Sequence, residues 1–135
     1  MFDRPGPDAR PLVAVAAISG VYDVLLGLAL LFGQGLLASA LGVPAPVPPI
    51  HADLNGLFLL AVGIGYLLPY RRPDACRGYL WVMGVFLKGV GALLFVADHV
   101  VRHSPPAYLA FAATDGLLAL ATLWALLRVR TGRSW

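Results

Sequence analysis

The sequence contains few charged residues and a single cysteine. Of its 135 residues, 13% are charged and 59% are hydrophobic, whereas about 25% of the residues of a soluble domain are typically charged. This scarcity of charge excludes an ordinary soluble globular domain. The lone Cys76 excludes an intrachain disulfide, and we interpret it as an unreacted thiol in a loop.

Familiar catalytic and nucleic-acid-binding patterns are also missing. No glycine-rich phosphate loop follows a strand pattern, no Ser/His/Asp arrangement is evident, and no Cys/His haem-attachment pattern occurs. The net charge is +3, but no basic stripe interleaved with aromatic residues is present. We therefore predict no nucleic-acid partner and attribute the basic excess to contact with anionic lipid.

Long hydrophobic segments dominate the chain. A helix needs about 20 residues to cross the hydrocarbon of a bilayer. Four segments have approximately this length, at residues 12–32, 53–68, 78–97 and 107–127. The turns between the last three are short, which places successive spans antiparallel. The sequence thus predicts an all-α integral membrane protein, a single membrane domain over residues 1–135 built as an antiparallel four-helix transmembrane bundle.

The first loop, residues 33–52, is the only long one and is rich in proline. Its apolar part, residues 36–41, is expected to lie on or dip into the outer leaflet. The prolines that follow, at positions 44, 46, 48 and 49, cannot be helical and should run extended across the outer mouth of the bundle. A stiff connector is favoured over a lid.

Arginine placement predicts the orientation. Most arginines lie before the first span, between the second and third spans, or after the fourth, at positions 4, 10, 71, 72, 77, 128, 130 and 133. Only Arg102 lies in the opposite set of loops. By the positive-inside rule both termini are cytoplasmic. The expected location is the cell inner membrane, with a multi-pass topology.

Three spans carry one charged residue near their middle, on a seam of small residues. Asp23 has Gly20 and Gly27 at minus three and plus four, Lys88 has Gly84 and Gly91, and Asp115 has Ala112 and Ala119. These offsets fall on one helical face. Small residues mark close helix contacts and intramembrane charges avoid lipid, so both signals place the charges inside the bundle.

An unpaired charge at mid-membrane costs at least about 2.5 kcal/mol, so Lys88 should contact one or both of Asp23 and Asp115. Two acids and one base leave one net negative charge, which a proton on one aspartate would relieve. The set can lock helix register, line a binding cavity, or serve catalysis or ion movement. Asn55, near the outer end of the second span, either donates to the carboxylates or caps the helix locally.

A second polar group lies at the predicted outer rim and contains all three histidines. His99 and His103 are four residues apart and would share a helical face if the third span continues that far. With His51 this spacing suits a metal or a pH-sensitive contact. Because interfacial polar residues need no metal, we predict no metal site and keep the histidines as a weaker alternative.

The long loop ends in LGVPAP at 41–46 and leads to a glycine-rich second span, NGLFLLAVG at 55–63. In these motifs and in the order of its parts, the chain resembles the DoxX-like group of small bacterial four-span membrane proteins. The resemblance implies a polar set made of Asn55, Lys88 and Asp115. One branch of the group is similar to the small membrane subunit of a thiosulfate:quinone oxidoreductase, which implies a quinone-facing helper role.

The leading hypothesis is an accessory or binding protein whose polar core, Asp23, Lys88 and Asp115, lines a cavity for a lipid or quinone-like ligand. One alternative is a membrane-embedded isomerase or oxidoreductase that uses the same acids. Another is a transporter or channel subunit, which requires a homo-oligomer because four spans enclose little pore. A partner membrane protein is a further expectation, and no cofactor is specified.

Overall fold

The computed structural model describes residues 6–129, and every regular element in this range is a helix. The α-helices are α1 (Arg10–Phe32), α2 (Gln34–Leu41), α3 (Ile50–Gly65), α4 (Leu67–Arg71), α5 (Arg77–Tyr79), α6 (Lys88–Arg102) and α7 (Leu109–Arg128). Element η2 (Leu80–Leu87) is a π-helix that continues α5 into α6, while η1 (Pro7–Ala9) and η3 (Pro106–Tyr108) are short 3₁₀-helices.

Four helical stretches are long and apolar enough to cross a membrane, as the hydrophobic segments predicted. They are Arg10–Phe32, Ile50–Arg71, Arg77–Arg102 and Pro106–Arg128. A helix suits this environment because it satisfies its backbone hydrogen bonds internally. The second stretch begins at Ile50 and ends at Arg71, three residues beyond the expected range on each side. At its end, Pro69 lies in the first turn of the short α4, where a missing backbone N–H needs no partner.

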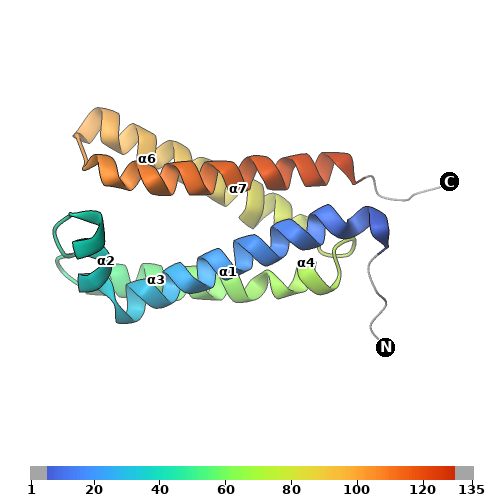
Figure 1. The fold of residues 1–135 in the computed structure, drawn as a ribbon, viewed down its shortest axis with the longest axis horizontal. Helices are drawn as coiled ribbons and strands as arrows, with labels where there is room; N and C mark the ends of the chain where they lie inside the picture. The colour runs from blue at the N-terminus through green and yellow to red at the C-terminus, as the bar shows by residue number, and fades with distance from the viewer. Residues whose placement is uncertain (1–5, 130–135) are drawn as a thin grey trace.

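The long helices form two layers (Figure 1). Helices α1 and α3 lie side by side in the lower layer, and α6 and α7 lie side by side in the upper one. The beginning of α1 and the end of α7 lie at the right-hand end, which we call the terminal end. The opposite end, where α2 lies, is called the loop end.

Glycines allow α1 and α3 to approach backbone to backbone. A Cβ atom on Gly27 would lie 2.7 Å from the Gly56 carbonyl oxygen and 2.7 Å from the Leu60 nitrogen. A Cβ atom on Gly63 would lie 2.7 Å from the backbone nitrogen of Val24. No larger residue fits these positions without moving a helix, so the predicted small-residue seam is a real contact here.

The upper layer packs through a similar but looser seam. A Cβ atom on Gly84 would lie 2.7 Å from the methyl group of Thr122, whereas one on Gly116 would lie 3.7 Å from Ala92. Phe95 and Phe111 add an aromatic contact between α6 and α7, with ring centroids 5.6 Å apart. Glycine is therefore a steric requirement at Gly84 alone among these positions.

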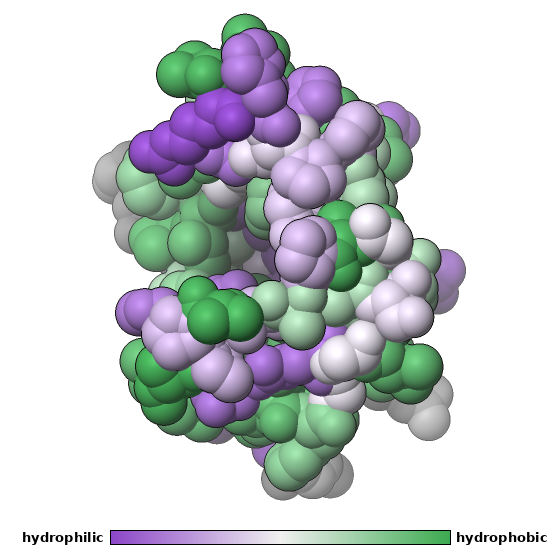
Figure 2. Space-filling model, turned by 90° about the vertical axis from the view of Figure 1, so that its left-hand side faces the viewer, coloured by the Kyte–Doolittle hydropathy of each residue, from purple (hydrophilic) through white to green (hydrophobic). Residues whose placement is uncertain are grey.

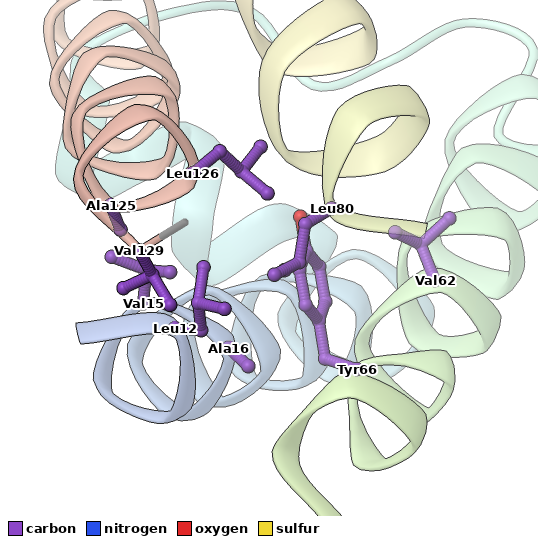
Figure 3. Packing of buried hydrophobic residues seen from close by; sticks show 9 residues of the cluster. All are labelled: Leu12, Val15, Ala16, Val62, Tyr66, Leu80, Ala125, Leu126 and Val129. Atoms are coloured by element: carbon purple, nitrogen blue, oxygen red, sulfur yellow. The ribbon is translucent and has the colours of Figure 1, made fainter. Parts of the chain in front are cut away.

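The two layers are joined at the terminal end by a hydrophobic cluster drawn from α1, α3, η2 and α7 (Figure 3). Its buried members are Leu12, Val15, Ala16, Val62, Tyr66, Leu80, Ala125, Leu126 and Val129. Tyr66 packs edge to face against Tyr79 at 5.1 Å, and the Tyr79 hydroxyl donates to the Val62 carbonyl. This cluster closes the terminal end of the molecule.

The first loop contains a helix that the sequence pattern did not assign. Its apolar part is α2, which ends at Gly42 with a left-handed φ of 66°. The following residues, 43–49, form no helix, as the prolines predicted. The side-chain amide of Gln34 donates to Asp53 and so ties the start of α2 to the first turn of α3.

Candidate functional site

A buried ion pair links α1 to α6 in the middle of the molecule. The Lys88 Nζ atom donates to the Asp23 Oδ1 atom at 2.6 Å, and the two side chains are only 4% and 1% exposed. The buried residues of α1 recur every three or four positions, from Leu12 through Asp23 to Gly27, and therefore form one interior stripe. Asp23 is held inside the bundle by this periodicity.

Asp115 of α7 is the second acid of the cluster. Its Oδ1 atom lies 3.6 Å from Lys88 Nζ, and its side chain retains 20% exposure. The predicted contact of Lys88 with both carboxylates is thus present, although the two contacts are unequal. Asp23 is buried and hydrogen-bonded to Lys88, whereas Asp115 lies farther from Lys88 and is more accessible.

An aromatic ring completes the surroundings of the ammonium group. Lys88 Nζ lies 5.1 Å from the centroid of the Tyr22 ring, within the range of a cation–π interaction. The hydroxyl groups of Tyr22 and Thr114 are hydrogen-bonded at 2.6 Å, which joins α1 to α7 beside the cluster. Tyr22 was not among the residues expected at this site, although its place next to Asp23 brings it here.

Lys88 is the first residue after the π-helical stretch η2. A π-helix has a wider turn than an α-helix and therefore changes the direction in which the next residues point. Such stretches occur often at functional sites, and no hydrophobic pattern in the sequence distinguishes this one. The π-helical stretch ends at Leu87, and α6 begins with Lys88, the only lysine in the sequence.

A cleft of about 560 Å³ runs along α6 from Gly91 to Arg102, toward the loop end. Its lining residues are Gly91, Leu94, Phe95, Ala97, Asp98, Val101 and Arg102. Figure 2 views the loop end and shows an indentation between the upper and lower helix pairs. Within residues 6–129, α3 and α6 form no interface comparable to those of α1 with α3 or of α6 with α7.

The inner end of this cleft lies at Gly91, three residues after Lys88 on α6. A Cβ atom on Gly91 would have only one neighbour within 4 Å among the described residues, the Asp115 Oδ2 atom at 4.0 Å. The cleft is apolar along most of its wall and has Asp98 and Arg102 at its outer end.

No protein-family model, no curated protein and no solved structure matches this chain.

Asn55 lies apart from the three charged residues. Its side chain is exposed on α3, and it forms no side-chain hydrogen bond with any residue in 6–129. Gly56, the next residue, packs against α1. Consecutive residues of a helix point in different directions, so the Asn55 side chain points away from that interface. The structure therefore brings together Asp23, Lys88 and Asp115 without Asn55.

The three histidines form no ligand set. Across residues 6–129, no group of three His, Cys, Asp or Glu side chains is placed to hold a metal ion. Helix α6 ends at Arg102, and His103 takes a left-handed conformation with φ of 57°, so His99 and His103 do not share a helical face. His99 instead makes a 2.7 Å hydrogen bond to the Ser104 carbonyl, and His51 is exposed.

Two uncharged polar residues near the cluster were missed by the sequence reasoning. Ser19 is fully buried one helical turn before Asp23, and Tyr66 is 1% exposed. The spacing of four between Ser19 and Asp23 could have signalled Ser19. No pattern could have signalled Tyr66, because a tyrosine near the end of a span is ordinarily an interfacial anchor.

Proposed function

We propose that this chain is an accessory membrane protein that binds a lipid or a quinone-like molecule in the cleft along α6. The ligand's polar head lies at Gly91, next to Asp115 and Lys88, and its apolar tail follows Leu94 and Phe95 toward the loop end. The observation that carries this proposal is the asymmetry of the cluster. Asp115 keeps 20% exposure, and its Oδ2 atom lies 4.0 Å from the Cβ position of Gly91, which lines the cleft, whereas Asp23 is sealed in the interior.

The charges of the cluster support a head group that donates or accepts hydrogen bonds. Lys88 already donates to Asp23 and has further N–H groups directed toward Asp115. A carbonyl or phosphate oxygen of a ligand would accept from Lys88, and a ligand hydroxyl would donate to Asp115. Both kinds of group occur in lipids and in quinones or quinols.

We also propose an orientation of the four spans in the membrane. The four spans form an antiparallel bundle in the inner membrane, with the terminal end cytoplasmic and the loop end outside. Three basic residues near the terminal end, Arg71, Arg72 and Arg77, support this orientation. The resemblance to the DoxX-like group supports a quinone as one of the two ligand classes.

A substitution that fills the cleft tests the proposal. Gly91→Leu adds a side chain where the structure has space, so the bundle should fold, but the side chain should occupy the position of the ligand head. The probes are a benzoquinone with a decyl chain and the lipids that copurify from the host membrane. Native mass spectrometry of the protein released from mild detergent reports both.

We expect the unaltered protein to retain one of these molecules and Gly91→Leu to lose it at an unchanged melting temperature. Gly89→Leu is the matched control, because Gly89 is two residues away on α6, faces Ala119 of α7 and does not line the cleft. Retention of the ligand by Gly91→Leu, or no retained molecule in any form of the protein, would refute the proposal.

A further inference from the structure

Three buried polar atoms on the terminal-end side of the ion pair have no hydrogen-bond partner among residues 6–129. They are the Ser19 Oγ, Asp23 Oδ2 and Tyr66 Oη atoms. All three side chains are at most 1% exposed. A buried polar group without a partner costs about 1–3 kcal/mol, and most such groups in proteins bind a protein group or an ordered water. Three at one place call for a common explanation.

The three groups lie close together. Ser19 and Asp23 are one turn apart on the interior stripe of α1. Tyr66 packs on the same helix, because a Cβ atom on Gly20 would lie 3.0 Å from the Tyr66 Cβ atom. Because Ser19 and Gly20 are neighbours in the chain, this contact places Tyr66 next to the turn of α1 that carries Ser19, yet no hydrogen bond joins the Ser19, Asp23 and Tyr66 side chains within residues 6–129.

Their chemistry is complementary to water. Asp23 Oδ2 only accepts when ionised, whereas the hydroxyl groups of Ser19 and Tyr66 both donate and accept. A buried water needs two to four polar partners, which these groups supply. A cation is disfavoured because the Lys88 ammonium already lies 2.6 Å from the other oxygen of the same carboxylate.

We infer that Ser19, Asp23 and Tyr66 enclose a buried water-binding site on the terminal-end side of the ion pair. Asp23 then has a partner for each oxygen, Lys88 on one side and water on the other. The hydrophobic cluster around Leu80 and Leu126 closes this site toward the terminal end. The water hydrates Asp23 independently of any ligand in the cleft along α6, so this inference does not rest on the proposed function.

The sign of a stability change distinguishes a hydrated site from a dry one. If the Tyr66 hydroxyl were dry and unpartnered, Tyr66→Phe would remove a buried polar group without the loss of a hydrogen bond and would raise the melting temperature. If the hydroxyl binds water, the same change removes a hydrogen bond and lowers the melting temperature. Ser19→Ala tests the second hydroxyl by the same logic.

Tyr79→Phe is the matched control. The Tyr79 hydroxyl already donates to the Val62 carbonyl, so its removal measures the loss of a satisfied tyrosine hydroxyl in the same part of the bundle. We expect Tyr66→Phe, Ser19→Ala and Tyr79→Phe all to lower the melting temperature. The effects of the first two should be non-additive in the double variant, because both hydroxyls would bind the same water.

A second measurement separates water from a direct Ser19–Tyr66 hydrogen bond. In water-edited solid-state NMR of the protein in phosphatidylcholine vesicles, the Tyr66 ring carbon bearing the hydroxyl should receive magnetisation early from water. Its signal is identified by its absence in Tyr66→Phe. An increased melting temperature for Tyr66→Phe and Ser19→Ala would overturn the inference. So would transfer to Tyr66 no faster than transfer to the methyl groups of buried Leu80.

Discussion

Lys88 and Asp23 are separated by 65 residues of chain and are joined by one buried hydrogen bond of 2.6 Å. Each group compensates the charge of the other, since an isolated charge at this depth would be unfavourable. The pair also connects the two helix layers at a point away from the hydrophobic cluster of the terminal end. Its removal should therefore affect both the stability of the bundle and the packing of one layer against the other.

Replacing Lys88 with methionine should destabilise the bundle. Lys88→Met retains a side chain of similar length but leaves the Asp23 and Asp115 carboxylates facing each other without a cation. Breaking a buried pair from one side costs about 3–5 kcal/mol. Unfolding of the detergent-solubilised protein, followed by circular dichroism, measures the change. The triple variant with both aspartates changed to leucine should recover stability, and an unchanged melting temperature in Lys88→Met alone would contradict the assigned pair.

The two aspartates should respond unequally to neutralisation. Asp23→Asn weakens a short, buried, charged hydrogen bond, which is worth about 1.5–3 kcal/mol. Asp115→Asn affects a 3.6 Å contact with partial exposure, for which about 1 kcal/mol or less is expected. Melting temperatures of the two variants, compared in the same detergent, give the order. Equal losses, or a larger loss for Asp115→Asn, would reverse the assignment of the principal partner.

The glycine contact between α1 and α3 should not tolerate a methyl group. In Gly27→Ala the new Cβ atom would lie 2.7 Å from backbone atoms of α3, so the helices must separate. Overpacking of this kind costs about 1–3 kcal/mol. Gly35→Ala in α2 is the control. Apart from its chain neighbours and the backbone of its own helix, no described atom lies within 4 Å of the added Cβ. Similar melting temperatures for the two variants would show that the seam is not tightly packed.

Cysteine labelling tests the proposed orientation. The natural Cys76 lies between α4 and α5 at the terminal end and is partly exposed. A membrane-impermeant maleimide should label it only after the inner membrane is permeabilised. A variant with Cys76→Ser and Ala45→Cys, which moves the thiol to the exposed loop before α3, should be labelled without this step. The opposite pattern would invert the topology.

The sequence was sufficient for the features that depend on hydrophobic length and for the glycine seam of α1, whereas Gly91, in the predicted seam of the third span, lines an open cleft. The four spans agree with the four long helices, and the pairing of Lys88 with both aspartates follows from the cost of an isolated charge. The spacing of Gly20 and Gly27 on α1 also corresponds to a real backbone contact with α3. These features are local or are required by the membrane, so a single sequence contains them.

The remaining features depend on how the helices are rotated about their axes. Asn55 lies in the same span as the glycine seam but one residue away from it, and this offset exposes it. The burial of Tyr66 depends on its contact with Gly20, a residue 46 positions earlier in the chain. His103 leaves the helix because its backbone becomes left-handed, which the spacing of the histidines does not reveal.

The long separation between Asp23 and Lys88 has a consequence for biosynthesis. At about 5–20 residues per second, the ribosome makes Lys88 about 3–13 s after Asp23. The first span therefore reaches the insertion machinery before its counter-ion exists, and we expect its carboxyl group to enter lipid carrying a proton. Nascent chains that end before Lys88 should insert this span less efficiently than the same chains with Asp23→Asn. The buried hydrogen bond between the two side chains can form only when the third span arrives.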